Sequence, residues 1–300
     1  MACLVCATSA WLAGGQGAYA LSQAWQHCTG ANLGEAVAGC SQIIDAGKET
    51  PTNLSIAYNN RGNALAEQGR LGAAIKDFDE ALRLYSRVPQ IRYARARAYA
   101  EAGKPNEALD DLDAFLKAVP DDADALMNRG NVYARLGDVS KAMDDYVAAL
   151  KVRPDFVEVY FNKGLMKLAH GQFHLSIKDF DAVLSVSPKD VHALNARGQA
   201  QLEIGLTNRA LADFEEAIKL QPGYAESYAN RCGALLKRSK TDEALADCSK
   251  AIELDPRSTL AYFRRGQARA ESGEHQAAIT DFDAAIALQP SDPKFYKWRG

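Results

Sequence analysis

Four cysteines could form covalent cross-links in this chain, and their spacing pairs them. They are Cys28, Cys40, Cys232 and Cys248, an even set that remains once the cysteines of the apolar first twenty residues are set aside. The first two flank Gly34, where an opening helical hairpin would turn, and the other two lie symmetrically about a second turn. Cysteines opposed across a hairpin can be bridged. We therefore predict the disulfides Cys28–Cys40 and Cys232–Cys248; the alternative is four small buried thiols in a cytoplasmic protein.

The remaining residues do not form the motifs that metal binding or catalysis requires. His170 and His174 are four residues apart, but Gly171 between them is expected to end a helix, and further ligands are missing nearby. The sequence has no glycine-rich phosphate loop, no Gly-x-Ser-x-Gly elbow and, after residue 20, no Cys-x-x-Cys. We therefore predict no metal site, no cofactor and no catalytic residues, and we expect that the protein is not an enzyme.

Charged residues recur with a period of 34 residues. When Ser55 is position 1, a basic residue occupies position 7 of every unit: Arg61, Arg95, Arg129, Lys163, Arg197, Arg231, Arg265 and Arg299. An aspartate occupies position 23 of each complete unit: Asp77, Asp111, Asp145, Asp179, Asp213, Asp247 and Asp281. If a turn lies near position 15, the two face each other across a hairpin. We expect an ion pair in each unit, because arginine forks favour a nearby carboxylate; a basic stripe that binds a ligand is the alternative.

Paired helices are the elements that would position these side chains. Complete units start at Ser55, Pro89, Ala123, Val157, Val191, Ala225 and Thr259. Small residues at positions 8 and 20 let two helices approach, and a large or apolar residue at position 24 fills the space between them. Glycine at position 15 is expected to end the first helix, and proline at position 32 the second. A fixed period of this length predicts a solenoid of antiparallel helical hairpins.

From Ser55 to Gly300 these units resemble the tetratricopeptide repeat, with its aromatic, small, glycine, alanine and proline positions in register. The resemblance implies an all-α fold, a right-handed α-solenoid whose first (A) helices line the concave side. Departures are Ser86 at the proline position, Arg92 at an aromatic position and Ser239 at position 15. The expected division is a signal peptide (1–20), a degenerate capping hairpin (21–54), seven repeats (55–88, 89–122, 123–156, 157–190, 191–224, 225–258 and 259–292) and the start of a truncated eighth (293–300).

The resemblance also implies that positions 2, 5, 9 and 12 of each A helix face a groove that binds an extended peptide. In the first three repeats the candidate side chains are mostly polar: Asn59, Asn63, Tyr93, Arg97, Met127 and Asn131. Later repeats contribute the polar residues Asn195, Gln199 and Gln267 and the apolar residues Phe161, Leu165, Leu168, Leu202, Leu236 and Phe263. Clustered apolar side chains on such a face favour a bound partner; the alternative is that some of them pack against neighbouring A helices.

The first twenty residues differ from the rest of the chain. They carry no charge, contain an apolar run and end in Ala18-Tyr19-Ala20, which matches a signal-peptidase site. We expect export to the periplasm and cleavage after Ala20, although a basic n-region is missing; the alternative is a buried N-terminal helix in a cytoplasmic protein. The opening with Trp25, Cys28 and Cys40 also looks like that of exported bacterial repeat proteins.

Composition narrows the class of partner. The formal net charge is −3, and the charged residues, 24% of the chain, are of both signs, interspersed, without a dense basic run, which argues against nucleic acid as a partner. No stretch after residue 20 is long and apolar enough for a membrane span. We predict a non-enzymatic scaffold for a protein or an extended peptide segment. The alternative is a targeting or regulatory arm of a larger enzyme or secretion machine whose other domain lies beyond Gly300.

Overall fold

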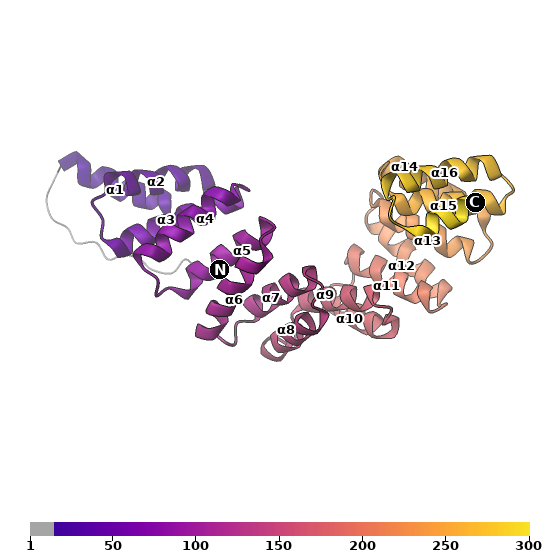
Figure 1. Cartoon of the computed structure of the whole chain (residues 1–300), viewed down its shortest axis with the longest axis horizontal. Coiled ribbons are helices and arrows are strands. Elements are labelled where there is room, and N and C mark those ends of the chain that lie inside the picture. Colours follow the sequence, from indigo (N-terminus) through magenta and orange to yellow (C-terminus); the bar gives the residue numbers. More distant parts are fainter. Residues whose placement is uncertain (1–14) are drawn as a thin grey trace. The chain divides into compact units, whose positions relative to one another are not determined.

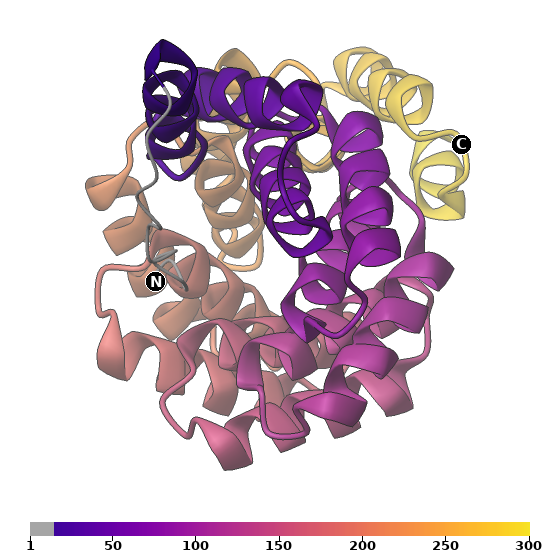
Figure 2. The ribbon, with the colours of Figure 1, turned by 90° about the vertical axis from the view of Figure 1, so that its left-hand side faces the viewer.

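Helices build the whole described part of this chain. The structure, a computed structural model, describes the backbone of residues 15–300 and the side chains from Ser22 onward, and within that range it contains no strand. The residues group into two compact units, an N-terminal unit that ends at Pro154 and a C-terminal unit, Asp155–Gly300. Within each unit, helices that follow one another in the sequence pack side by side (Figures 1 and 2). The fold is an α-solenoid of antiparallel helical hairpins, as predicted.

The helices alternate between A and B members of each repeat. The N-terminal unit holds α1 (Gly15–Cys28), α2 (Leu33–Ala46), α3 (Pro51–Glu67), α4 (Leu71–Leu84), α5 (Pro89–Glu101), α6 (Pro105–Ala118), α7 (Ala123–Arg135) and α8 (Val139–Val152). The C-terminal unit holds α9 (Val157–Ala169), α10 (Phe173–Val186), α11 (Val191–Glu203), α12 (Thr207–Leu220), α13 (Ala225–Leu236), α14 (Thr241–Leu254), α15 (Thr259–Glu271), α16 (His275–Leu288) and α17 (Pro293–Arg299). From α3 onward the odd-numbered helices are the A helices.

An aromatic ring packed on a glycine holds most hairpins together. The ring of Phe78 on α4 lies so close to Gly62 on α3 that a Cβ there would be 2.8 Å from a ring carbon. The pairs Gly130/Tyr146, Gly164/Phe180, Gly198/Phe214 and Gly266/Phe282 repeat this arrangement, with a hypothetical Cβ at 2.6–2.8 Å. Any side chain at position 8 would therefore push the two helices apart in these repeats. Two repeats differ: the second has Ala96 and Leu112, and the sixth has two cysteines.

The turns within the hairpins follow the sequence prediction. Glycine at position 15 takes a left-handed backbone conformation in six repeats, with φ between 71° at Gly171 and 81° at Gly205. Glycine enters this region without the steric cost that a Cβ brings. Ser239 holds the same position in the sixth repeat and adopts it too, with φ 58°, so the turn geometry is kept even where the glycine is missing.

The N-terminal boundaries differ from those expected. Gly34, predicted at a turn, lies in the first turn of α2, because the side chain of Asn32 accepts hydrogen bonds from the backbone N–H groups of residues 34 and 35. The first A helix begins at Pro51, four residues before the start of the first repeat unit at Ser55, since Thr50 caps it and proline is suited to the first helical position. The proposed signal peptide, residues 1–20, lies outside the described residues except for the backbone of 15–20, and it stays a prediction. No described helix is long and apolar enough to cross a membrane.

Candidate peptide-binding surface

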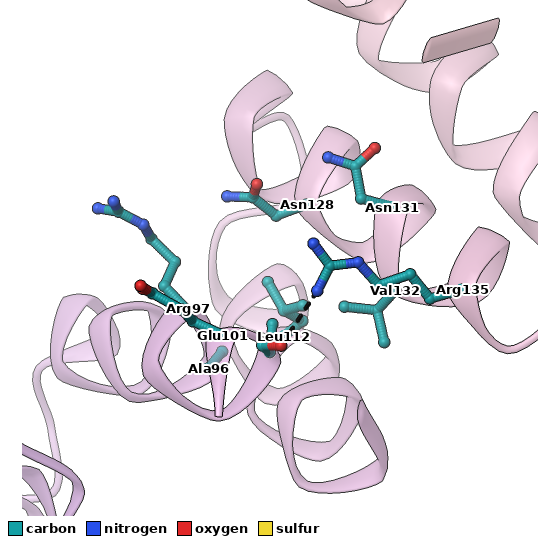
Figure 3. A pocket seen from close by; sticks show the side chains of 9 residues that line it. Ala96, Arg97, Glu101, Leu112, Asn128, Asn131, Val132 and Arg135 are labelled. Atoms are coloured by element: carbon teal, nitrogen blue, oxygen red, sulfur yellow. Dashed lines mark hydrogen bonds between the residues drawn. The ribbon is translucent and has the colours of Figure 1, made fainter. Parts of the chain in front are cut away.

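An open pocket lies on the A-helix face of the N-terminal unit, between α5 and α7. Its volume is about 300 Å³. Buried Ala96, Leu112 and Val132 contribute apolar walls. The polar and charged side chains that line it come from two helices: Arg97 and Glu101 from α5, and Asn128, Asn131 and Arg135 from α7 (Figure 3). Two of these apolar residues, Ala96 and Leu112, belong to the second repeat, where they replace the glycine and aromatic ring of most other repeats, and Val132 belongs to the third.

Hydrogen bonds with two tyrosines orient the amides of this pocket. Asn128 donates from Nδ2 to the hydroxyl of Tyr93 at 2.7 Å, and the Tyr93 ring packs on Phe115 with centroids 5.1 Å apart. The hydroxyl of Tyr146 donates to Oδ1 of Asn131 at 2.7 Å. Burial raises the pKa of Tyr146 to about 12, so this phenol stays a proton donor at neutral pH. Because both amide planes are held, one wall of the pocket is preorganised for hydrogen bonding.

The two arginines that line the pocket form no ion pair with a described carboxylate. Arg135 donates from Nη1 to the carbonyl oxygen of Ala100 at 3.1 Å, and Arg97 is exposed on α5. Glu101 is the single acidic residue of the lining. A guanidinium has five N–H donors, so both cations keep hydrogen-bonding capacity at the mouth of the pocket.

Sequence reasoning identified part of this site. Arg97 and Asn131, both predicted, line the pocket, and Tyr93 positions Asn128 beside them. Asn59 and Asn63 lie on α3 and are not part of the lining; the first is half-buried and the second exposed. Three polar or charged lining residues were missed: Asn128 at position 6, and Glu101 and Arg135 at position 13. Since position 13 lies one helical turn beyond position 9, an i, i+4 comparison with Arg97 and Asn131 could have found the last two.

In the C-terminal unit most of the predicted apolar groove residues pack inside the fold. The Phe161 ring meets the Phe180 ring edge-on, with centroids 5.9 Å apart, and Phe263 packs on Phe282 and Phe295 at 5.9 and 5.0 Å. Leu202 is buried, and Leu168 and Leu236 are half-buried. Leu165 is 40% exposed. In this unit an aromatic side chain at position 5 therefore covers the ring at position 24 of its own repeat. The contact of Phe263 with Phe295 on α17 is also the packing against a neighbouring A helix that was the alternative interpretation.

A line of polar side chains crosses the A helices of the same unit. Asn195 is 3% exposed and accepts a hydrogen bond from Nδ2 of Asn230 at 3.2 Å, which leaves it little contact with any ligand. Nη1 of Arg264 donates to Asn230 Oδ1 at 3.2 Å and to the Ala229 carbonyl at 2.7 Å. Burial lowers the pKa of Arg264 to about 10, so it remains a cation at neutral pH. Gln199 and Gln267 are half-buried on the neighbouring A helices α11 and α15.

The role of Arg264 was not predicted from the sequence, although Gly233 indicated it. Its guanidinium lies against Gly233 on α13, where a Cβ would be 2.5 Å from Cζ. Glycine in the middle of an A helix is unfavourable for helix formation, so it pointed to a close approach of another group. That group comes from the following repeat, which a search within one repeat could not reveal.

The recurring basic and acidic residues form ion pairs in all seven complete repeats, as predicted. Nε and Nη2 of Arg197 donate to the two carboxylate oxygens of Asp213 at 2.8 and 2.7 Å. Nη1 of Arg197 donates to Asp181 of the preceding repeat at 2.7 Å, a contact at position 25 that sequence reasoning missed. The hydrogen bond to Asp213 is the largest cause that raises the pKa of Arg197. Arg197 is therefore held by carboxylates within and between repeats, and Arg95 and Arg129 are held in the same way.

No cysteine or histidine of the described residues is part of the pocket lining. Disulfides join Cys28 on α1 to Cys40 on α2 and Cys232 on α13 to Cys248 on α14, with Cα atoms 4.6 and 5.5 Å apart. The second bridge occupies the place of the glycine and aromatic ring in its repeat. His170 follows α9, and His174 is in the first turn of α10; no cluster of side chains able to hold a metal ion occurs in the described part of the chain.

Family models of the tetratricopeptide repeat match most of the chain. One matches residues 93–155, 161–225 and 234–293, and a second matches residues 55–87. Every repeat predicted from the 34-residue period therefore falls wholly or largely within a matched segment. No curated protein matches this chain.

Solved structures of similar fold share little sequence with this chain. A tetratricopeptide repeat protein from Parabacteroides merdae has a TM-score of 0.68 and 21% identity over 82% of this chain and 97% of its own. A chain of the APC/C hetero-tetramer Cut9–Hcn1 has a TM-score of 0.66 and 17% identity, over 93% of this chain and 54% of its own. PilW, described as a type IV pilus biogenesis factor, has a TM-score of 0.62 and 19% identity, over 70% and 98%. At such low sequence identity, the structural similarity to these proteins shows the fold of this chain and no more.

Proposed function

Because this chain belongs to the tetratricopeptide repeat family, we propose that it is a non-enzymatic scaffold that binds a protein or peptide segment on the A-helix face of its N-terminal unit. Repeats of this family generally act as protein-interaction scaffolds. The observation that carries the proposal is the open pocket between α5 and α7, with its two oriented amides. An extended peptide needs hydrogen-bond partners for its backbone and pockets for its side chains, and this surface offers both.

The lining of the pocket favours binding over catalysis. It contains no histidine, cysteine or serine, and Glu101 is its one carboxylate. General acid–base or nucleophilic chemistry needs a reactive side chain within hydrogen-bond reach of a partner that activates it. The lining has amides, guanidinium groups and apolar walls instead, which are groups that recognise a ligand.

Selection from a displayed library of random peptides tests the proposal. Peptides enriched on the full chain should bind it in solution, and Asn128→Ala should weaken them about five-fold, because a lost hydrogen bond costs about 1 kcal/mol. Asn106→Ala, an exposed amide on α6 outside the pocket lining, is the matched control. Circular dichroism checks that both variants fold. Failure to enrich any peptide would overturn the proposed function, and equal affinity in both variants would overturn the proposed site.

We also propose that the scaffold works in the periplasm. The support is the uncharged apolar leader that ends at Ala20 and the two cysteine pairs, which suit an oxidising compartment. N-terminal sequencing of the protein from fractionated cells should find residue 21 first, in the periplasmic fraction. Non-reducing peptide mapping should find Cys28–Cys40 and Cys232–Cys248 joined. An intact residue 1 on cytoplasmic protein with four alkylatable thiols would contradict both expectations.

A further inference from the structure

The pocket between α5 and α7 has an uncompensated positive charge. Its lining holds two guanidinium groups, Arg97 and Arg135, against one carboxylate, Glu101, which leaves a net charge of +1. Arg135 uses one N–H group on the carbonyl of Ala100, and Arg97 uses none on the described residues. This differs from the arginines at position 7, such as Arg95, whose guanidinium binds Asp111 and Asp79. The pocket arginines are therefore cations that the fold itself does not neutralise.

Other carboxylates near the pocket are already engaged. Asp122 and Asp124 are close enough to Tyr93 to affect its pKa, which burial raises most. Asp122 caps α7 by accepting the backbone N–H of Ala125 at 2.8 Å, and Asp124 binds Nη2 of Arg153 at 2.6 Å. Neither is part of the pocket lining, so the lining keeps its net positive charge.

The inner part of the pocket is apolar. Ala96, Leu112 and Val132 are each at most 2% exposed, and they line the same space as the charged groups. Figure 3 shows Leu112 and Val132 beside the guanidinium of Arg135, with Asn128 and Asn131 above them. A ligand group that fits this combination has an aliphatic stem and an anionic end. Stem contacts add dispersion and burial, and the anion gains charge-assisted hydrogen bonds.

We propose that this pocket binds the side chain of a glutamate within an extended peptide segment. The methylene groups lie on Ala96, Leu112 and Val132, and the carboxylate accepts hydrogen bonds from Arg97 and Arg135. Asn128 binds the peptide backbone beside it. This assignment rests on the proposed function and adds the chemical class of the segment that is bound: one with a glutamate at the anchoring position.

Substitutions on both partners test the assignment. Peptides enriched from the displayed library on the full chain are synthesised with each glutamate, and again with that residue changed to glutamine or aspartate. Fluorescence anisotropy then measures the affinity for the wild type, Arg97→Gln, Arg135→Gln and Arg209→Gln. Arg209 is an exposed arginine on α12, far along the sequence from the pocket, and is the charge-matched control.

One glutamate in the enriched peptides should account for much of their affinity. Changing it to glutamine should weaken wild-type binding about ten-fold, because the charged hydrogen bonds are lost while the stem is kept. The same change should have an effect at least three-fold smaller in Arg97→Gln or Arg135→Gln, since a double-mutant cycle reports direct contact as coupling. Arg209→Gln should behave as the wild type. Binding should also weaken as salt rises, because the mouth of the pocket is open to solvent.

The outcomes separate this inference from the proposed function. If no peptide is enriched, both are wrong. If peptides bind but none needs a glutamate, the scaffold function stands and the glutamate assignment is wrong. The assignment is also wrong if the glutamate matters equally in all four proteins, because its carboxylate then binds elsewhere. Both pocket arginines are exposed, so their variants are expected to fold; circular dichroism confirms this before binding is measured.

Discussion

Replacing Arg197 with alanine should destabilise the hairpin of α11 and α12, because it leaves a buried carboxylate without its ion-pair partner. Asp213 is 7% exposed, and Arg197 supplies two hydrogen bonds to it, at 2.8 and 2.7 Å. The third contact of Arg197 goes to Asp181, whose side chain is 54% exposed. The variant therefore removes one buried pair and one exposed pair at once, and the two losses differ greatly in size.

The buried pair dominates the expected cost. Breaking a fully buried ion pair costs about 3–5 kcal/mol, and since 22% of the Arg197 side chain is exposed we expect about 2–3 kcal/mol here. An exposed pair is worth about 0.2–1 kcal/mol. Asp181→Asn, which keeps the buried pair and removes the exposed charge, is thus the matched control, with an expected loss below about 1 kcal/mol.

Native-state hydrogen exchange is the suitable assay. A solenoid loses its repeats separately, so one unfolding midpoint does not locate the damage. Peptides from α11 and α12 should exchange roughly thirty-fold faster or more in Arg197→Ala, which corresponds to about 2 kcal/mol, and no more than about five-fold faster in Asp181→Asn. Equal effects in the two variants would refute the reasoning. Unchanged exchange with weaker peptide binding would instead support a ligand-binding stripe of arginines.

Four further substitutions test other parts of the fold by urea unfolding. Ser239→Gly should stabilise the sixth repeat by about 0.5–1 kcal/mol, because it relieves about 1–2 kcal/mol of left-handed strain at some entropic cost. Gly233→Ala should destabilise by about 1 kcal/mol, since the new Cβ displaces Arg264 from its carbonyl contacts. The higher helix propensity of alanine compensates for only part of those lost hydrogen bonds. Phe161→Ala should cost about 2 kcal/mol more than Leu165→Ala, because the phenylalanine packs on a buried ring and the leucine is 40% exposed.

Each of these expectations has a control within the chain. A Cβ added to Gly72 on α4 would meet no atom within 4 Å, so Gly72→Ala should stabilise where Gly233→Ala destabilises; loss in both would contradict the role given to Arg264. A destabilised Ser239→Gly would show that the serine side chain matters more than the backbone strain. If Phe161→Ala and Leu165→Ala lower the free energy of unfolding equally, Phe161 is not a packing residue and its original assignment to the groove is favoured.

The sequence alone determined the repeating part of the architecture. The 34-residue period, glycine at position 15 and the small residues at position 8 predict antiparallel hairpins because the forces behind them act within one repeat. The ion pair between positions 7 and 23 could be predicted for the same reason: Arg197 and Asp213 lie on two helices of one hairpin, joined by a short turn. Arg97 and Asn131 were also found, through the groove positions that the resemblance to the tetratricopeptide repeat implies.

The tertiary structure decided which side chains are free for a ligand. Asn195 and Phe161 occupy groove positions in the sequence, but the first is bonded to Asn230 of the next repeat and the second covers Phe180. The pocket exists where Leu112 replaces a ring and where α5 and α7, from different repeats, leave space between them. Periodicity describes one repeat at a time, whereas burial and pairing depend on the particular side chains of its neighbours, and only packing in three dimensions brings those together.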